Sequence, residues 1–197
     1  TYSRYFDRSA KYESGWDGAG ADDKLSPFDS LVREFASQYG FDWRLIIAQM
    51  YQESRFNPEA KSWAGAVGLM QIMPRTGMQI AKDLNERWSG KNSLYDPVKN
   101  LRYGSYYYQK LLNQFNGNYA IAAAAYKAGP NRVKKWLPDE SVAADIWIET
   151  IPFNETREYV TNVLVYALIY QQRMDSDELT MADLTRDVQP LIDIASK

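Results

Sequence analysis

Residues 42–54 read DWRLIIAQMYQES and predict an amphipathic helix that starts at Asp42. The apolar residues of this stretch recur at helical spacing: Trp43, Ile46, Ile47, Met50 and Tyr51. Glu53 shares their stripe, because Ile46, Met50 and Glu53 stand at positions i, i+4 and i+7. Burial and the negative end of the helix macrodipole both disfavour an ionised carboxylate there. We therefore expect a raised pKa for Glu53, as a general acid at neutral pH requires.

A second interpretation of Glu53 remains open at this point. The carboxylate could lie at the rim of the fold and form an ion pair with Arg55 or Lys61. The pattern of residues 42–54 does not decide between the two.

The rest of the chain from Ser26 onward is also patterned as helix, and strand-like alternation is nearly absent. Helix starts are marked by Ser26 with Pro27, by Thr76, by Asp96 with Pro97, and by a capping box that begins at Thr180. Helices are also predicted at 119–128 and 154–173, and residues 55–68 are loop-like. The predicted fold class is mainly α.

Three segments are predicted within the 197 residues. Residues 1–25 are rich in Tyr, Asp and Gly without periodicity and predict an extended arm or linker. Residues 26–175 form the helical domain, and residues 176–197 form a helical extension at the C-terminus. The chain begins at Thr1 without Met, so we expect a processed protein or an excised fragment.

Composition excludes several classes of function. The chain has no Cys and no His, which excludes disulfides, thiol nucleophiles, His-ligated zinc and Ser–His triads. Proton transfer would fall to carboxylates, Tyr or Lys. The formal charge of −2 offers no basic surplus for nucleic acid. No apolar run approaches the length of a membrane span, so we expect a soluble chain that is not transmembrane.

Aromatic residues make up 14% of the chain, and 15 of them are Tyr. Such rings suit a cleft that binds sugars or peptides, although most of them are expected to pack in the core.

Four motifs stand in a fixed order along the chain: QESRFNP at 52–58, GAVGLMQIMP at 65–74, AYKAGP at 125–130 and IPFNETREYV at 151–160. They resemble the ES, GLMQ, AYNAG and ETRxYV motifs of bacterial lytic transglycosylases, most closely the soluble Slt type. The resemblance runs from about Pro27 to Gln172. It implies a lysozyme-like (goose-type) helical domain.

The resemblance also implies an activity. Enzymes of this family cleave the β-1,4 bond between N-acetylmuramic acid and N-acetylglucosamine in peptidoglycan and leave 1,6-anhydromuramoyl ends. A single Glu acts first as the acid and then as the base, and this residue corresponds to Glu53. Two carboxylates are otherwise usual in glycosidases, but an intramolecular 6-hydroxyl nucleophile removes the need for the second. No metal or cofactor is required.

Further site residues are implied by the same resemblance. It indicates that substrate is bound by Ser62, Gln71, Met73, Tyr126, Glu155 and Tyr159, and that Ser54 and Gly68 support the site. The structural alternatives are core filling for Met73, helix packing for Tyr126, a helix-terminal acid for Glu155 and a tight turn for Gly68. Tyr126 is expected to point its hydroxyl freely into the cleft.

Two residues depart from the family pattern. Lys127 stands where the family has Asn, and a cation near Glu53 would lower its pKa unless it points away or meets peptide carboxylates. Gly77 stands where Ala is common, which predicts only a small loss of helix propensity.

The leading hypothesis is thus a lytic transglycosylase acting on peptidoglycan glycan strands. The alternatives are a goose-type lysozyme hydrolase that uses water and a non-catalytic wall-binding module. The resemblance implies a location in the periplasm or cell envelope, and we expect a monomer that could belong to a longer parent chain with other domains.

Overall fold

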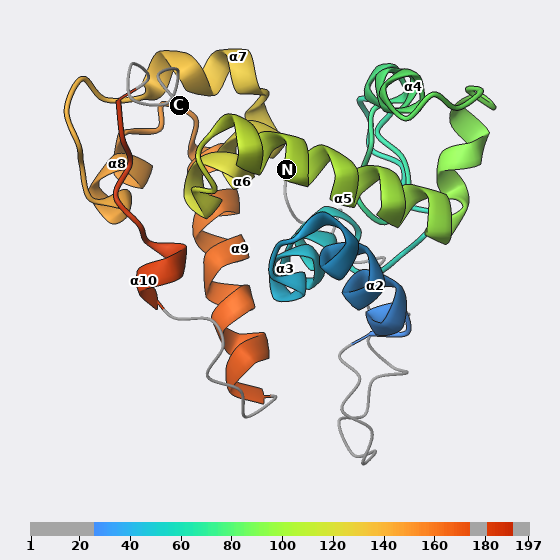
Figure 1. The fold of residues 1–197 in the computed structure, drawn as a ribbon, viewed down its shortest axis with the longest axis horizontal. Helices are drawn as coiled ribbons and strands as arrows, with labels where there is room; N and C mark the ends of the chain where they lie inside the picture. Colours follow the sequence, from blue (N-terminus) through green and yellow to red (C-terminus); the bar gives the residue numbers. More distant parts are fainter. Residues whose placement is uncertain (1–25, 174–180, 191–197) are drawn as a thin grey trace.

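The computed structural model describes residues 26–173 and 181–190. Within them the chain is mainly helical (Figure 1), with short 3₁₀ helices at Lys91–Tyr95 (η1) and Lys134–Trp136 (η2). The α-helices are α2 (Asp29–Tyr39), α3 (Trp43–Ser54), α4 (Pro74–Asp83), α5 (Pro97–Gln114), α6 (Tyr119–Ala128), α7 (Pro130–Val133), α8 (Ala144–Thr150), α9 (Asn154–Arg173) and α10 (Met181–Leu184). Strand-like pairing in the described ranges is limited to isolated bridges. The predicted mainly α class is confirmed.

Side-chain caps fix several helix starts where the sequence predicts them. The Asp42 carboxylate accepts a hydrogen bond from the Arg44 backbone N–H at 2.8 Å, and Asp96 accepts one from Lys99 at 2.7 Å. The bounds of α6 and α9 agree with the predicted ranges 119–128 and 154–173. Local pattern was sufficient for these helices.

Other helix boundaries differ from the prediction. The helix expected after Ser26 begins only at Asp29, because Ser26 closes a turn in which its hydroxyl donates to the Asp29 carboxylate at 2.7 Å. Helix α4 begins at Pro74 and not at Thr76, since the ring of proline suits the first helical position. Helix α8 was not predicted. Thr180 and residues 1–25 lie outside the described residues.

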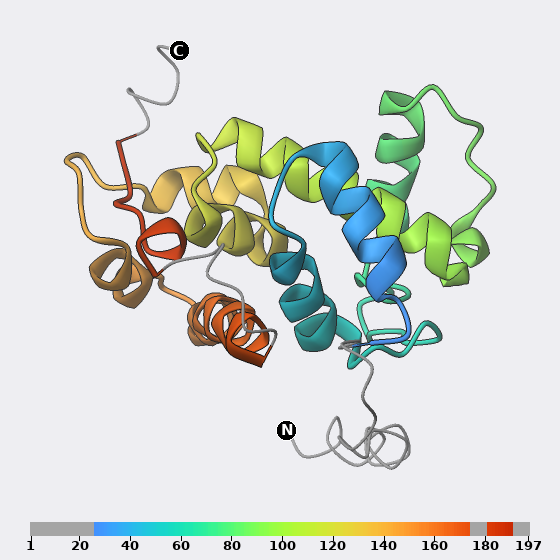
Figure 2. The ribbon, with the colours of Figure 1, turned by 60° about the horizontal axis from the view of Figure 1, so that its bottom comes forward.

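Helix α3 lies at the centre of the domain and packs against α2 on one side and α9 on the other. Figures 1 and 2 both show α9, in orange, beside α3. Helix α6 packs against α5 and α9, and the side chains of residues 120–125 are at most 1% exposed. These positions are Ala except for Ile121, and small side chains allow the close approach of neighbouring helices. Helix α6 therefore lies deep in the domain.

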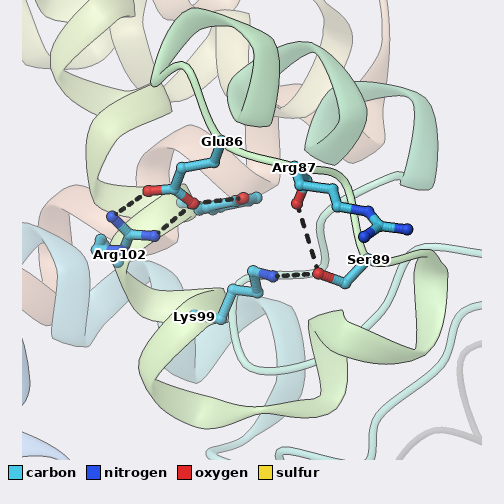
Figure 3. A network of polar contacts seen from close by, with 6 residues as sticks. Glu86, Arg87, Ser89, Lys99 and Arg102 are labelled. Atoms are coloured by element: carbon cyan, nitrogen blue, oxygen red, sulfur yellow. Dashed lines mark hydrogen bonds and ion pairs between the residues drawn. The ribbon is translucent and has the colours of Figure 1, made fainter.

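The segment between α4 and η1 is attached to α5 by a polar network (Figure 3). Arg102 donates to both carboxylate oxygens of Glu86, with N–O distances of 2.6 and 2.7 Å, and the Tyr103 hydroxyl donates to the same carboxylate at 3.0 Å. Lys99 donates to the Ser89 hydroxyl at 3.3 Å. The hydrogen bond from Arg102 lowers the pKa of Glu86 below its ordinary value. This network holds the segment that follows α4 against α5.

Gly77 has a packing role that its helix propensity does not indicate. A Cβ at this position would lie 2.9 Å from Cη2 of Trp88 and 3.3 Å from Cδ2 of Leu94. The ring of Trp88 therefore packs against α4 at Gly77, where the helix has no side chain. The expectation of a small propensity effect only was wrong, because the contact with Trp88 is tertiary.

No helix in the described ranges combines the length and the apolar character that crossing a bilayer demands.

Candidate active site

Glu53 lies in the last turn of α3, on the stripe that the sequence predicted. Met50 and Ile46, one and two turns earlier, are completely buried, whereas Glu53 itself is partly exposed. The Tyr159 hydroxyl donates a hydrogen bond to Oε1 of Glu53 at 2.8 Å. Glu53 therefore joins α3 to α9 at the edge of the core, and part of its side chain remains accessible.

The electrostatic environment of Glu53 favours its neutral form. Removal from water raises the pKa of Glu53 to about 7 and is the largest influence. The positive charge of Lys127 and the hydrogen bond from Tyr159 act in the opposite direction, while the charge of Glu155 adds a further increase. The expected raised pKa is confirmed, and no ion pair of Glu53 with Arg55 or Lys61 occurs in the described residues. A carboxyl group of this kind can both donate and accept a proton near neutral pH.

Two tyrosines approach Glu53 from different helices. Tyr159 is 6% exposed, and burial raises the pKa of its phenol well above the ordinary value. Tyr126 is close enough for the charge of Glu53 to raise the pKa of its phenol as well. The Tyr126 hydroxyl was expected to point freely into the cleft. It instead donates a hydrogen bond to the backbone carbonyl of Met70 at 2.8 Å. Tyr126 therefore attaches the GLMQ segment to α6.

Lys127 and Glu155 form an ion pair beside this group, with a distance of 2.8 Å between Nζ and Oε1. The Lys127 ammonium also lies 5.4 Å from the centre of the Tyr159 ring. Glu155 is 65% exposed, so the carboxylate that reaches Glu53 electrostatically is mostly in solvent. The two residues form part of a hollow that Arg132 and Phe153 also line.

The loop between α3 and α4 contains Ser62, Gly68 and Gln71. The Ser62 hydroxyl accepts from the backbone N–H of Ala66 at 2.9 Å and stabilises a turn. Both donors of the Gln71 side chain are occupied by backbone carbonyls, that of Gly68 at 2.9 Å and that of Ala60 at 3.2 Å. Only Oε1 of Gln71 is left to contact a ligand. The structure thus gives both polar side chains a role in shaping the loop.

Met73 and Ser54 complete the set of predicted site residues. Met73 is 41% exposed, which excludes the alternative of core filling. The Ser54 hydroxyl donates to the carbonyl of Met50 at 3.2 Å and is buried. Directly after Ser54, Arg55 and Phe56 adopt positive φ angles of 52° and 61°. Two such residues in succession end α3 directly after Ser54, and their left-handed backbone conformation costs some strain.

Asn100 organises this loop from α5, and the sequence pattern did not single it out. Its Oδ1 accepts from the Met70 backbone N–H at 2.8 Å, and its Nδ2 donates to the carbonyls of Val67 and Leu94 at 2.9 and 2.7 Å. Asn100 is completely buried. Gly68, at φ 77°, has no room for a Cβ because the Asn100 amide fills that space. The sequence feature that could have identified Asn100 is the position of an Asn directly before Leu101, on the apolar face of a helix.

Among the described residues, no cluster of three or more acidic side chains has the geometry to hold a metal ion. A mainly helical domain that presents one carboxyl group with a pKa near neutrality is suited to acid–base chemistry on a bound substrate.

The Transglycosylase SLT domain model matches residues 30–146, and a Soluble lytic transglycosylase helical domain model matches residues 150–179. The first match covers more than half of the 197 residues, so the chain belongs to the Transglycosylase SLT domain family. The resemblance inferred from the four motifs is confirmed.

The relatives include proteins named soluble lytic murein transglycosylase, among them one from Salmonella typhimurium and one from Escherichia coli K12. That of Salmonella typhimurium is 43% identical over 135 residues, which are 67% of this chain and 21% of the relative. That of Escherichia coli K12 is 38% identical over 161 residues, which are 80% of this chain and 25% of the relative. The chain thus spans about a quarter of the length of these relatives.

Solved structures show the same fold. Lytic transglycosylase Slt from Pseudomonas aeruginosa, in an inactive Glu-to-Gln mutant, aligns with a TM-score of 0.73 and 41% identity over 85% of this chain and 27% of that one. The 70 kDa soluble lytic transglycosylase from Escherichia coli also gives 0.73, with 34% identity over 79% of this chain and 26% of that one. The predicted lysozyme-like helical fold is confirmed.

Proposed function

We propose that this chain is the catalytic domain of a lytic murein transglycosylase, with Glu53 as its single acid–base residue. Its substrate is the β-1,4 bond between N-acetylmuramic acid and N-acetylglucosamine, and its product carries a 1,6-anhydromuramoyl end. The observation that carries the proposal is the partly buried Glu53 carboxyl, with a pKa of about 7 and a hydrogen bond from Tyr159. The membership of the family supports it.

The reaction proceeds in two proton transfers at one carboxyl group. Protonated Glu53 donates its proton to the glycosidic oxygen, and the bond from that oxygen to the anomeric carbon breaks. The carboxylate of Glu53 then accepts the proton of the muramoyl 6-hydroxyl, whose oxygen bonds to the anomeric carbon. Both forms of Glu53 are populated at neutral pH, because its pKa is about 7. The carboxyl is protonated again at the end of the cycle.

A second catalytic carboxylate is not needed in this scheme. The usual pair serves to deliver water or to form a covalent intermediate, whereas here the substrate supplies its own nucleophile. The 6-hydroxyl is held beside the anomeric carbon, and such proximity favours it over water. Glu155, the other acid whose charge reaches Glu53, is paired with Lys127. The inactive Glu-to-Gln mutant of the Pseudomonas aeruginosa relative agrees with a reaction that depends on a Glu.

The proposal extends to the residues that bind the glycan. Met73 offers an exposed apolar surface, Gln71 offers Oε1, and Glu155 offers a solvent-facing carboxylate. Tyr159 orients Glu53 directly, and Tyr126 supports the loop through Met70. Ser62, Ser54 and Gly68 then shape the backbone that carries these contacts.

The products of purified peptidoglycan distinguish this reaction from hydrolysis. Intact sacculi are digested with the chain, and the released muropeptides are analysed by mass spectrometry. Anhydromuramoyl ends are expected. Reducing ends in their place would identify a goose-type lysozyme hydrolase, and binding to sacculi without release of any fragment would identify a wall-binding module.

The wider setting is also a proposal. We propose that the chain acts in the periplasm or cell envelope on peptidoglycan glycan strands, as part of a longer parent protein, and that it is monomeric by itself. The division into an arm at 1–25, a domain at 26–175 and an extension at 176–197 stays a prediction. Limited proteolysis followed by mass measurement of the stable fragments tests the boundaries, and light scattering tests the oligomeric state.

A further inference from the structure

The last turn of α6 and the first turn of α9 meet in an ion pair next to Glu53. Lys127 and Glu155 are 2.8 Å apart, and the Lys127 ammonium lies 5.4 Å from the centre of the Tyr159 ring. The hydroxyl of that ring donates to Glu53 at 2.8 Å. A continuous series of contacts therefore runs from the ion pair to the carboxyl group that is proposed to react.

We propose that Lys127 is a positioning residue for this reaction: paired with Glu155, it holds the ring of Tyr159 where the hydroxyl meets Glu53. The inference rests on the proposed function and adds to it a residue at which this chain departs from the AYNAG pattern. The side chain of Lys127 is 28% exposed, so its attraction to Glu155 and to the ring is only partly weakened by solvent.

The same pair places opposite charges beside Glu53. Among the described residues, the pKa of Glu53 is influenced by Tyr159 and Glu155 from α9 and by Lys127 from α6. Tyr126 on α6 also faces Glu53, whose charge raises the pKa of the Tyr126 phenol. Lys127 lowers the pKa of Glu53, and Glu155 raises it. The two charges are in contact with each other and so offset one another at Glu53. An Asn in place of Lys127 would leave the charge of Glu155 unopposed.

Three variants test whether the charges of Lys127 and Glu155 offset each other at Glu53. They are K127M, E155Q and the double variant, and Met is chosen because it keeps the apolar stem of Lys. The ionisation of Glu53 is followed by carboxyl ¹³C NMR in protein labelled at Glu, with E53Q used to assign the signal. We expect the midpoint to rise by about half a pH unit in K127M and to fall by a smaller amount in E155Q, because Lys127 has the larger influence on Glu53. In the double variant the midpoint is expected to lie between those of the parent and K127M, because the smaller and opposite effect of Glu155 is removed as well.

Turnover of peptidoglycan by the same proteins tests the positioning. K127M is expected to lose roughly threefold in kcat at neutral pH and to shift its rate–pH profile in the same direction as the NMR midpoint. K127R keeps the positive charge, so it is expected to retain the kcat and the rate–pH profile of the parent. The control is K135M, because Lys135 is an exposed cation on η2 that does not line the hollow.

The outcomes separate this inference from the proposed function. An unchanged Glu53 midpoint in K127M, a rise in E155Q, or an equal shift in K135M would overturn it, even if the parent cleaves peptidoglycan. Because the NMR titration needs no turnover, an inactive parent would overturn the proposed function and leave the electrostatic result readable. If K127M does not fold, K127R and E155Q still decide the question.

Discussion

The hydroxyl of Tyr159 donates to Oε1 of Glu53 at 2.8 Å, although 106 positions separate the two residues in the chain. The contact joins the last turn of α3 to the second turn of α9, the longest helix of the described residues. Tyr159 is buried in the core, whereas Glu53 is partly exposed, so the Glu53 carboxyl is largely removed from water and still accessible from outside. Substitutions at Glu53, at Tyr159 and in the surrounding packing test this arrangement.

Replacing Glu53 by Gln should abolish turnover and leave the fold intact. General acid–base catalysis contributes a factor of roughly 10² to 10⁴, and Gln cannot transfer the proton. The measurement is the release of soluble muropeptides by E53Q, with circular dichroism of the same sample. E59Q is the matched control, because Glu59 is exposed on the loop after α3. A parent-like rate in E53Q would remove Glu53 from the mechanism.

Stability should depend on pH through Glu53. Its pKa of about 7 in the folded state lies above the ordinary value of 4.5, so the unfolded chain loses this proton first as pH rises. The contribution of Glu53 to stability is therefore fully present below pH 4.5 and is lost as pH rises through 7. E53Q should be more stable than the parent at pH 8, on the order of 2 kcal/mol, and similar at pH 4.5. Urea unfolding at both pH values measures this, and an equal difference at both would contradict it.

Removing the Tyr159 hydroxyl should weaken catalysis more than folding. The hydrogen bond lowers the pKa of Glu53, so Y159F should move the rate–pH profile to higher pH. We expect roughly a tenfold loss in kcat and a loss of about 1 kcal/mol in the free energy of unfolding. Y166F serves as the control, because Tyr166 lies on the same helix and packs its ring on Tyr51, and this hydrogen bond is made by Tyr159. A profile identical to that of the parent would show that Tyr159 does not act on Glu53.

Asn100 should be among the most sensitive positions for stability. N100A leaves the Met70 N–H and the carbonyls of Val67 and Leu94 without their side-chain partner in a buried site. The expected loss is about 3 kcal/mol in the free energy of unfolding, measured by urea titration. N92A is the comparison, since Asn92 is exposed on η1, and should change stability by less than about 0.5 kcal/mol. Equal effects of the two substitutions would refute the role assigned to Asn100.

Gly77 to Ala should destabilise the protein, although Ala is the better helix former. The gain in propensity is about 1 kcal/mol, whereas crowding the Trp88 ring costs about 1 to 3 kcal/mol. Thermal unfolding of G77A measures the net effect. In a W88L background the same substitution should become neutral or stabilising, because the crowding ring is gone. A stabilising G77A in the parent would return Gly77 to a propensity effect alone.

The sequence by itself determined the features that arise within one helix. Asp42, Asp96 and Asn118 each cap a helix through a side chain that reaches only two or three residues along the chain. The stripe that puts Glu53 in register with Met50 depends only on helical periodicity. The order of the four motifs was enough to indicate the family, because those residues stand in the sequence itself.

Tertiary structure decided the rest. Tyr159 bonds to Glu53, Tyr126 bonds to Met70, and Lys127 pairs with Glu155 only because α3, α6 and α9 pack together. The hydrogen bonds of Asn100 to Met70 and Val67 likewise require α5 to lie against the loop that precedes α4. Helix periodicity tells which side of a helix is buried but not which neighbour covers it. For that reason the direction of a hydroxyl or an ammonium group, and with it the pKa of Glu53, was settled by packing between helices.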